Sequence, residues 1–488
     1  MPELKLRPSG ITRRPDPARV LLRPFIPGDA ERIRAVIQRA LALTEEETEQ
    51  QMAVILADFG SRHLNLPAVW HRHYGHIARH VPTGSPELTE ARQLYLGALF
   101  SGEYALESAA LFNPSMVPHP DQSGLPPGAL RFVLSLRATG EGHISSIEFR
   151  TGTITAALEI TLEEPSRMVT APTLNPNPTY RKSVFLDKLA EMGFANAWST
   201  AVLGPLARDF TLAELEGAMQ RAAPIEEEAP REDQRTRECV HWLAKSNYEV
   251  EFGAETSLSE RAIFPVSANE SNGIEDARFV RFTEEDGSTL YYATYTAYNG
   301  HAILPQLLET TDFRHFRART LNGRAVQNKG MAFFPRRVGG RYAMLSRQDD
   351  EKLFLMFSDN PHFWSEPQLL RRPRYPWETV KIGNCGSPLE TPHGWLVITH
   401  GVGPMRQYSL GAILLDLEDP ARVIGELSTP LVRPTGNERE GYVPNVVYTC
   451  GALLHAGSLV LPYGLSDSAT TIGTMPLAEL LGAMKQPT

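Results

Sequence analysis

The segment SNGIEDARFV at residues 271–280 places an acidic pair, Glu275 and Asp276, between a glycine and a short apolar run. A carboxylate at the start of a buried strand is either a solvated turn residue or a general acid that gives a proton to a reacting oxygen. Turn residues are the commoner of the two. The function of Asp276 therefore depends on which other polar side chains converge on it.

Four potential cations stand beside other apolar runs of the chain. Arg137, Arg347 and His400 each lie at the end of such a run, and Lys381 lies in WETVKIGNCGSP, ahead of another. Gathered in one concave site of an acidic protein, these side chains would bind an anion, because arginine offers forked donors that match phosphate. Each of them could instead pair with a local acid, as surface cations commonly do.

The apolar runs repeat along the chain. Five stretches share an apolar core that ends in polar or small residues: ALRFVLSLRATG (129–140), TLYYATYTAYNG (289–300), RYAMLSRQDDE (341–351), GWLVITHGVG (394–403) and SLVLPYGLSD (458–467). Strand-like segments precede and follow each run, and the last four copies start roughly fifty to sixty residues apart. This spacing suits a blade of about four strands. The sequence therefore predicts a mainly β fold, a five-bladed β-propeller.

In a propeller, the innermost strands surround one central channel, so that equivalent strand ends converge there. The repeats place five polar residues at such ends: Arg137, Tyr298, Arg347, His400 and Asp467. Asp276 stands just ahead of the second repeated run. We expect all of these side chains on the rim of a single pocket.

Two other parts of the chain have helical texture. Residues 31–43 carry apolar residues at three- and four-residue spacing, and capping boxes start further helices at Thr44 and at Thr211. Ser85-Pro86-Glu87 predicts another helix start, and the charge-rich stretch 226–238 predicts a solvated loop or helix face.

We expect an N-terminal helical domain at 1–105 and a catalytic propeller domain at 106–488, interrupted by a helical insertion at about 165–240. The apolar faces of the added helices must be buried, so we expect them to shape the pocket entrance or the subunit interface of a homo-oligomer.

Composition and charge limit the function. The 488 residues are 42% hydrophobic and carry a net charge of −9, which indicates a large globular core and argues against nucleic-acid and membrane partners. No apolar stretch is long enough to span a bilayer, and the three cysteines have no CxxC spacing. We expect a cytoplasmic protein.

Histidines in WHRHYGHIARH could lie on one helix face, as metal ligands can: His73, His76 and His80. No HExxH motif or nearby cysteine accompanies them. A structural role is the favoured interpretation, and no metal site is predicted.

Several motifs resemble those of glycoside hydrolase family 130, the β-mannoside phosphorylases and related β-mannosidases: NPSMV, GIEDAR with TYTAY, KIGNCGSP, ITHGV, YSLGAILLDLEDP, EREGYVPNVV and YGLSD. The resemblance covers roughly residues 110–160 and 245–488 and implies a five-bladed propeller, in agreement with the repeats. It implies inverting cleavage of a β-mannoside oligosaccharide by inorganic phosphate, which gives α-mannose 1-phosphate. Phosphate would be a co-substrate, and no cofactor is implied.

The resemblance also implies residue roles. Asp276 matches the catalytic acid, which would protonate the glycosidic oxygen through a mannose hydroxyl. Arg347, Lys381 and His400 match phosphate-binding positions. The remaining candidates would contact the substrate, Glu275 as a neighbour that orients the sugar or shapes the loop: Asn113, Ser115, Arg137, Glu275, Tyr298 and Asp467.

Two alternatives remain open at this point. An inverting β-mannosidase would need a second carboxylate as base, and Asp349 or Asp350 in RQDDEK could serve, although both also suit a turn. A propeller that binds carbohydrate without catalysis is the alternative from another class. It would have no need of an acid opposite a phosphate-binding cluster.

Overall fold

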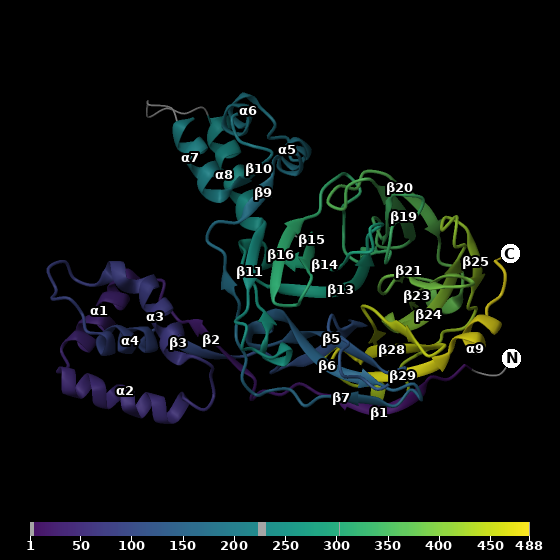
Figure 1. Cartoon of the computed structure of the whole chain (residues 1–488), viewed down its shortest axis with the longest axis horizontal. Coiled ribbons are helices and arrows are strands. Elements are labelled where there is room, and N and C mark those ends of the chain that lie inside the picture. The colour runs from purple at the N-terminus through teal and green to yellow at the C-terminus, as the bar shows by residue number, and fades with distance from the viewer. Residues whose placement is uncertain (1–3, 223–230, 302, 488) are drawn as a thin grey trace.

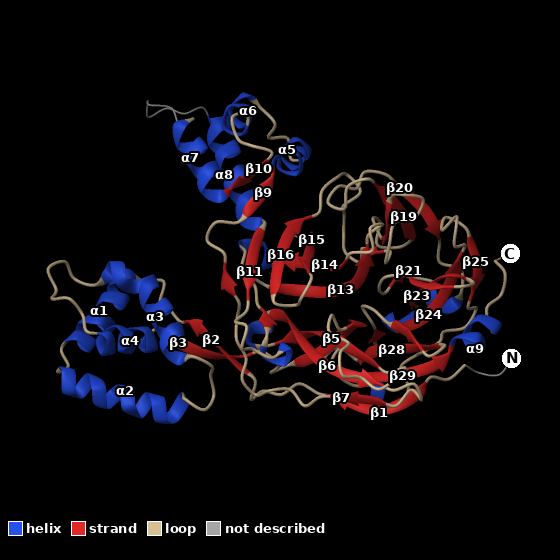
Figure 2. Cartoon of the chain, viewed as in Figure 1, coloured by secondary structure: helices blue, strands red, loops and turns tan. Residues whose placement is uncertain are grey.

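The structure, a computed structural model, describes residues 4–222, 231–301 and 303–487. Groups of antiparallel strands follow one another around a common centre, and helices form two bodies outside this ring (Figure 1; Figure 2). The fold is therefore mainly β with added helices, as the sequence predicts.

Each of the five apolar runs forms a strand that pairs with the strand before it and the strand after it. The five strands formed by the runs are β5 (Leu130–Thr139), β14 (Thr289–Tyr298), β18 (Tyr342–Ser346), β23 (Gly394–Val402) and β28 (Ser458–Leu465). Valine, tyrosine, leucine and isoleucine fill these strands because both of their faces are buried, and such side chains pack well on a pleated surface.

The strands that precede these runs in their sheets are β4 (Ala110–Pro118), β13 (Gly273–Thr283), β17 (Ala332–Phe333), β21 (Lys381–Asn384) and β26 (Val447–Tyr448). The strands that follow are β6 (Ser145–Ile154), β15 (Ile303–Thr310), β19 (Leu353–Ser358), β24 (Tyr408–Leu415) and β29 (Ala469–Pro476). Outer strands complete the groups: β7 (Ile160–Leu162), β16 (His315–Thr320), β20 (Pro367–Arg371), β25 (Val423–Glu426) and β1 (Arg7–Arg13).

Short strands extend this framework. β12 (Ala262–Ile263), β22 (Leu389–Thr391) and β27 (Leu453–His455) pair with β6, β23 and β28, and β11 (Tyr248–Glu251) and β8 (Thr173–Leu174) continue the sheet beyond β16. A single parallel pair, Gly273 with Ser145, joins the first two groups into one sheet. Helix α9 (Leu477–Gly482) follows β29.

The N-terminal segment is less purely helical than the sequence predicts. β1 pairs with β29, so that residues 7–13 close the last group of strands although they begin the chain. β2 (Val20–Pro24) pairs with β3 (Ser101–Ala105), and four helices lie between them: α1 (Ala30–Leu41), α2 (Glu45–Phe59), α3 (Leu66–Ile77) and α4 (Glu90–Leu99). Thr44 caps α2 as predicted. Helix α4 begins at Glu90 with Thr89 as its cap, later than the predicted start at Pro86.

The insertion packs around its own apolar core of tyrosine, phenylalanine and leucine side chains. It contains β9 (Thr179–Arg181), α5 (Lys182–Glu191), α6 (Ala197–Leu203), β10 (Asp209–Thr211), α7 (Leu212–Arg221) and α8 (Arg231–Ser246). The capping box at Thr211 is present. In the charge-rich stretch, residues 226–230 lie outside the described residues, and the rest begins α8. Among the residues that the structure describes, no helix is long and apolar enough to cross a bilayer.

Candidate active site

A cavity of about 130 Å³ lies at the centre of the strand groups. Seven of the ten predicted site residues line it: Asn113, Arg137, Asp276, Arg347, Lys381, His400 and Asp467. They come from β4, β5, β13, β21 and β23 and from the positions just after β18 and β28. Four of the five repeated strand ends therefore converge, as the repeats predict.

Asp276 is aimed into this cavity by a distortion of its strand. The pairing of β13 with β14 shifts register between Glu275 and Arg278, and Asp276 has a left-handed backbone with φ +55°. The pairing of β4 with β5 shifts in the same way around Asn113, where φ is +48°. Such bulges turn a side chain away from the alternation of the sheet. As a result, the Asn113 amide donates a short hydrogen bond to Oδ1 of Asp276.

The Asp276 carboxylate is buried among positive charges. Arg137 Nη1 lies 3.5 Å from its Oδ1, and Arg278 Nη2 lies 3.8 Å from its Oδ2. Burial works to raise the pKa of Asp276, but the charges of Lys329, Arg278 and Arg137 outweigh burial and lower the pKa to about 2. Asp276 is thus a carboxylate at neutral pH.

Arg347 and His400 form a buried pair on another wall of the cavity. Arg347 Nη1 donates to His400 Nε2 at 2.9 Å, and both side chains are buried. Burial, together with the charge of Arg347, lowers the pKa of His400 well below its usual value. His400 is therefore a neutral imidazole that orients Arg347, and the expectation that it adds a positive charge to the cluster is wrong.

Lys381 already has a carboxylate partner. Its Nζ lies 2.8 Å from Oδ2 of Asp350, and Arg347 Nη1 lies 3.8 Å from Oδ1 of the same carboxylate. Partial burial works to raise the pKa of Asp350, but the hydrogen bond and the charge of Lys381 lower it. Asp349 faces elsewhere and pairs with Lys352 at 2.7 Å. Both carboxylates are therefore paired with lysines, and neither is free to act as the base of a hydrolase.

Asp467 differs from the other carboxylates of the site. Among the described residues, none makes a hydrogen bond or an ion pair with its side chain, although it lines the cavity. Burial, helped by the negative charge of Asp276, raises the pKa of Asp467 to about 7, even though Arg137 opposes the shift. A second carboxyl group in the cavity is therefore partly protonated at neutral pH.

Three of the predicted residues do not line the cavity. Glu275 instead binds two lining residues, Arg137 Nη2 at 2.7 Å and Lys329 Nζ at 3.8 Å. The Ser115 hydroxyl accepts a hydrogen bond from the backbone N–H of Phe279. The Tyr298 hydroxyl donates to the Gly300 carbonyl, so that it serves its own turn.

Sequence reasoning missed several lining residues: Lys329, Arg406, Tyr408, Val443, Val446 and Tyr448. Lys329 carried a usable signal, because it precedes the third repeat just as Asp276 and Lys381 precede the second and the fourth. Arg406 lies in a tight turn after β23 where both Met405 and Arg406 have positive φ, and no pattern in the sequence indicates that turn.

The histidines of α3 do not converge as ligands would. His73 is buried, and its Nδ1 is hydrogen-bonded to Ser101 Oγ at 2.6 Å, whereas His76 is exposed. Burial lowers the pKa of His73 to about 4. These contacts support a structural role for His73.

Comparisons with known proteins agree with the motifs. Residues 244–486 match the model of glycoside hydrolase family 130, described as beta-1,4-mannooligosaccharide phosphorylase. A 1,2-beta-oligomannan phosphorylase of Thermoanaerobacter is 31% identical over 231 residues, which are 44% of this chain and 74% of the relative. The chain belongs to glycoside hydrolase family 130. Membership makes it an enzyme of the glycoside phosphorylase and glycosidase class.

Other relatives carry related names. A beta-1,2-mannobiose phosphorylase of Listeria innocua is 29% identical over 47% of this chain and 65% of the relative. The solved structure of a Listeria innocua beta-1,2-mannobiose phosphorylase with beta-1,2-mannobiose covers 77% of this chain and 92% of that chain, with 19% identity and a TM-score of 0.45. The family match begins within α8, so the N-terminal helices and most of the insertion lie outside it.

Proposed function

We propose that this enzyme cleaves β-mannosides by inverting phosphorolysis and releases α-mannose 1-phosphate. One observation carries the proposal: Asp276, a buried carboxylate, shares a small cavity with the cations Arg137, Lys329, Arg347, Lys381 and Arg406. Phosphate arrives as an anion and needs electrostatic docking, whereas water needs a base to activate it. The names of the relatives support the same reaction class.

In this mechanism a phosphate oxygen attacks the anomeric carbon while the bond to the glycosidic oxygen breaks. Arg347 and Lys381 would hold the phosphate, and His400 would keep Arg347 in place by accepting its hydrogen bond. Asp276 would supply the proton that the leaving oxygen takes up, relayed by a mannose hydroxyl as the family resemblance implies. Bound phosphate would offset the positive charges that lower the pKa of Asp276, so that the acid could hold a proton.

The remaining side chains suit the sugar. Asn113, Arg137 and Asp467 line the cavity and offer donors and an acceptor to hydroxyl groups, and Glu275 would orient Arg137. Ser115 and Tyr298 would act on the sugar only indirectly, through the strands they brace. We propose no metal and no organic cofactor, with phosphate as the co-substrate.

The inverting β-mannosidase remains a second candidate because of Asp467. A base works best with a pKa near the working pH, and the pKa of Asp467 is about 7. Asp349 and Asp350 are less suitable because both are paired with lysines.

We also propose that the strand groups are the five blades of a propeller domain at 106–488, completed by β1, with 1–105 as a helical domain and 165–240 as an insertion. Five antiparallel groups around one cavity support this division. A cytoplasmic location and a homo-oligomer remain part of the proposal.

The deciding experiment is incubation with β-1,2- and β-1,4-mannobiose, with and without phosphate, while mannose 1-phosphate and free mannose are measured. We expect mannose 1-phosphate that appears only with phosphate. Equal cleavage without phosphate would establish the mannosidase. Sugar binding without turnover on any mannoside would favour the non-catalytic carbohydrate-binding alternative.

A further inference from the structure

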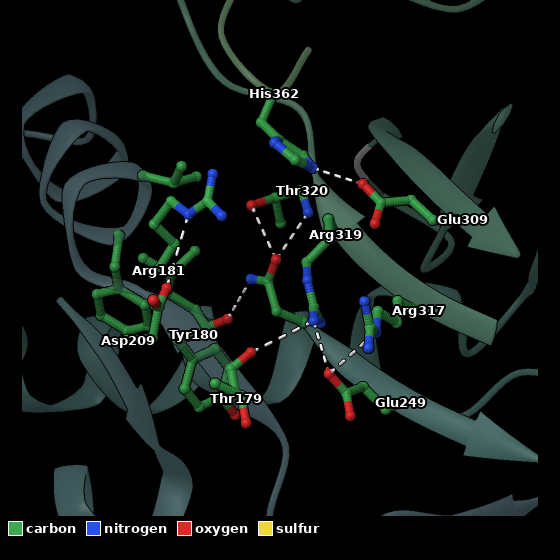
Figure 3. Close-up of a pocket in the computed structure, with 14 residues that line it drawn as sticks. Thr179, Tyr180, Arg181, Asp209, Glu249, Glu309, Arg317, Arg319, Thr320 and His362 are labelled. Atoms are coloured by element: carbon green, nitrogen blue, oxygen red, sulfur yellow. Dashed lines mark hydrogen bonds and ion pairs between the residues drawn. The ribbon is translucent and has the colours of Figure 1, made fainter. Parts of the chain in front are cut away.

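A second pocket, of about 350 Å³, lies between the insertion and the second strand group (Figure 3). One wall comes from β9, α5, β10 and α8, and the other comes from β11, β15 and β16, with His362 from the loop after β19. It shares no lining residue with the cavity around Asp276. Its volume falls within the range of about 300–1,000 Å³ that is usual for small-molecule sites.

Hydrogen bonds hold the polar side chains of this second pocket in fixed positions. Arg319 Nη2 lies 2.7 Å from Glu249 Oε1 and also donates to the carbonyl of Thr179 in the insertion. His362 Nε2 lies 2.7 Å from Glu309 Oε1 (Figure 3). These four charged or titratable side chains are only 17–19% exposed, so they present a preorganised polar surface.

Two further arginines at the second pocket are held loosely. Arg181 lies 3.6 Å from Asp209 and Arg317 lies 3.7 Å from Glu249, and their side chains are 58% and 65% exposed. Surface pairs of this length and exposure contribute little to stability. Their guanidinium N–H groups therefore remain available to a ligand.

The charges of the second pocket select a neutral ligand. Three arginines (Arg181, Arg317, Arg319) face three carboxylates (Asp209, Glu249, Glu309). An anion would meet the carboxylates and a cation would meet the guanidinium groups. A polyol satisfies both, because each hydroxyl can accept from an arginine and donate to a carboxylate.

The apolar part of the lining suits the same ligand. Val184, Phe185 and Leu243 form apolar surface beside the charged groups. A sugar ring has C–H faces as well as hydroxyl groups, so that it matches both kinds of lining. We infer that this pocket binds a short manno-oligosaccharide at a position separate from the catalytic cavity. The inference rests on the proposed function for the identity of the sugar.

The test is amide hydrogen exchange measured by mass spectrometry on the full chain carrying Asp276→Asn, which keeps the sugar intact. The probes are β-1,2-mannotriose, β-1,4-mannotriose and inorganic phosphate alone. Peptides from 179–185 and 315–320 report on the second pocket, and peptides from 273–283 report on the catalytic cavity. We expect at least one mannotriose to slow exchange in both regions and phosphate to leave the second pocket unchanged.

Val184→Trp should fill the second pocket and abolish the slowing at 179–185 and 315–320 while that at 273–283 persists. Ser183→Trp is the matched control, because Ser183 is exposed on the same helix and does not line the pocket. If Val184→Trp lowers the melting temperature markedly, Arg317→Gln takes its place, with weaker slowing expected.

If mannotriose slows amide exchange only in peptides from 273–283, the inference is overturned and the proposed function stands. If phosphate alone slows amide exchange in peptides from 179–185 and 315–320, the assignment to a neutral sugar is overturned. Slowing that survives both Val184→Trp and Arg317→Gln would also overturn it.

Discussion

Replacing Asp350 by asparagine should make the enzyme bind phosphate more tightly. The Asp350 carboxylate lies 2.8 Å from Lys381 Nζ and 3.8 Å from Arg347 Nη1, the two cations proposed to hold phosphate. Asp350 has a left-handed backbone with φ +58°, which asparagine tolerates well, so the loop should keep its shape. The variant therefore removes one negative charge and little else.

The expected size follows from Coulomb's law. A phosphate in contact with Lys381 would lie about 6 Å from the Asp350 carboxylate, where two unit charges repel by about 1.4 kcal/mol at an effective dielectric constant of about 40. The Asp350 side chain is 49% exposed, so solvent screens part of this repulsion. Removing about 0.7–1.4 kcal/mol of repulsion should lower the KM for phosphate by roughly three- to tenfold.

The assay is the initial rate of mannose 1-phosphate formation against phosphate concentration at saturating mannoside. Asp349→Asn is the matched control, because Asp349 lies in the same loop but pairs with Lys352. Its KM for phosphate should stay near that of the wild type. An unchanged or higher KM in Asp350→Asn would refute phosphate docking at Lys381. If the enzyme releases free mannose without phosphate, loss of that release in a folded Asp350→Asn variant would instead identify Asp350 as the base of a hydrolase.

Four further predictions concern the same cavity. Asp276→Asn should fold with a lower melting temperature, because Arg137 and Arg278 lose a buried carboxylate partner, and should lose about 10²–10⁴-fold in kcat, because an amide cannot act as the acid; a loss of less than tenfold in the initial rate would contradict its role. Lys381→Ala should raise the KM for phosphate by about one to two decades and leave the KM for mannoside nearly unchanged, as titrations of each substrate would measure. His400→Ala should raise the KM for phosphate without altering its pH dependence between pH 5.5 and 7.5, because burial keeps the imidazole neutral. If the KM of the wild type changes with pH in this range and that of His400→Ala does not, the histidine is charged. The free enzyme should lose stability as pH rises from about 4 to 7, because native Asp467 keeps its proton up to about pH 7 whereas an unfolded aspartate releases it near 4. The melting temperature of Asp467→Asn should fall less over the same pH range.

The sequence predicts the repeat and the convergence of the site for a physical reason. Each strand group needs an apolar strand buried on both faces, so the same pattern recurs wherever such a strand ends at the central cavity. Arg137, Arg347, His400 and Asp467 could be found in this way because each follows its apolar run directly. The fifth position, Tyr298, has an equivalent place in the strand, but its hydroxyl turns back to Gly300.

Register and long-range pairing could not be predicted. The bulges that aim Asn113 and Asp276 are irregularities of strand pairing, and the residue pattern of neither strand gives its register. β1 pairs with β29 although more than 450 residues separate them, and RPSGITR contains no apolar run that indicates a strand. The pairing of Lys381 with Asp350 likewise joins two loops whose approach only the fold determines.

The electrostatics of the cavity around Asp276 link phosphate to acid catalysis. Asp276 cannot donate a proton while the charges of Lys329, Arg278 and Arg137 hold its pKa at about 2. A phosphate anion held by Arg347 and Lys381 in the same cavity would offset part of that field and raise the pKa, whereas a neutral water would not. In the proposed reaction the acid would therefore become competent only when phosphate is present, which disfavours hydrolysis.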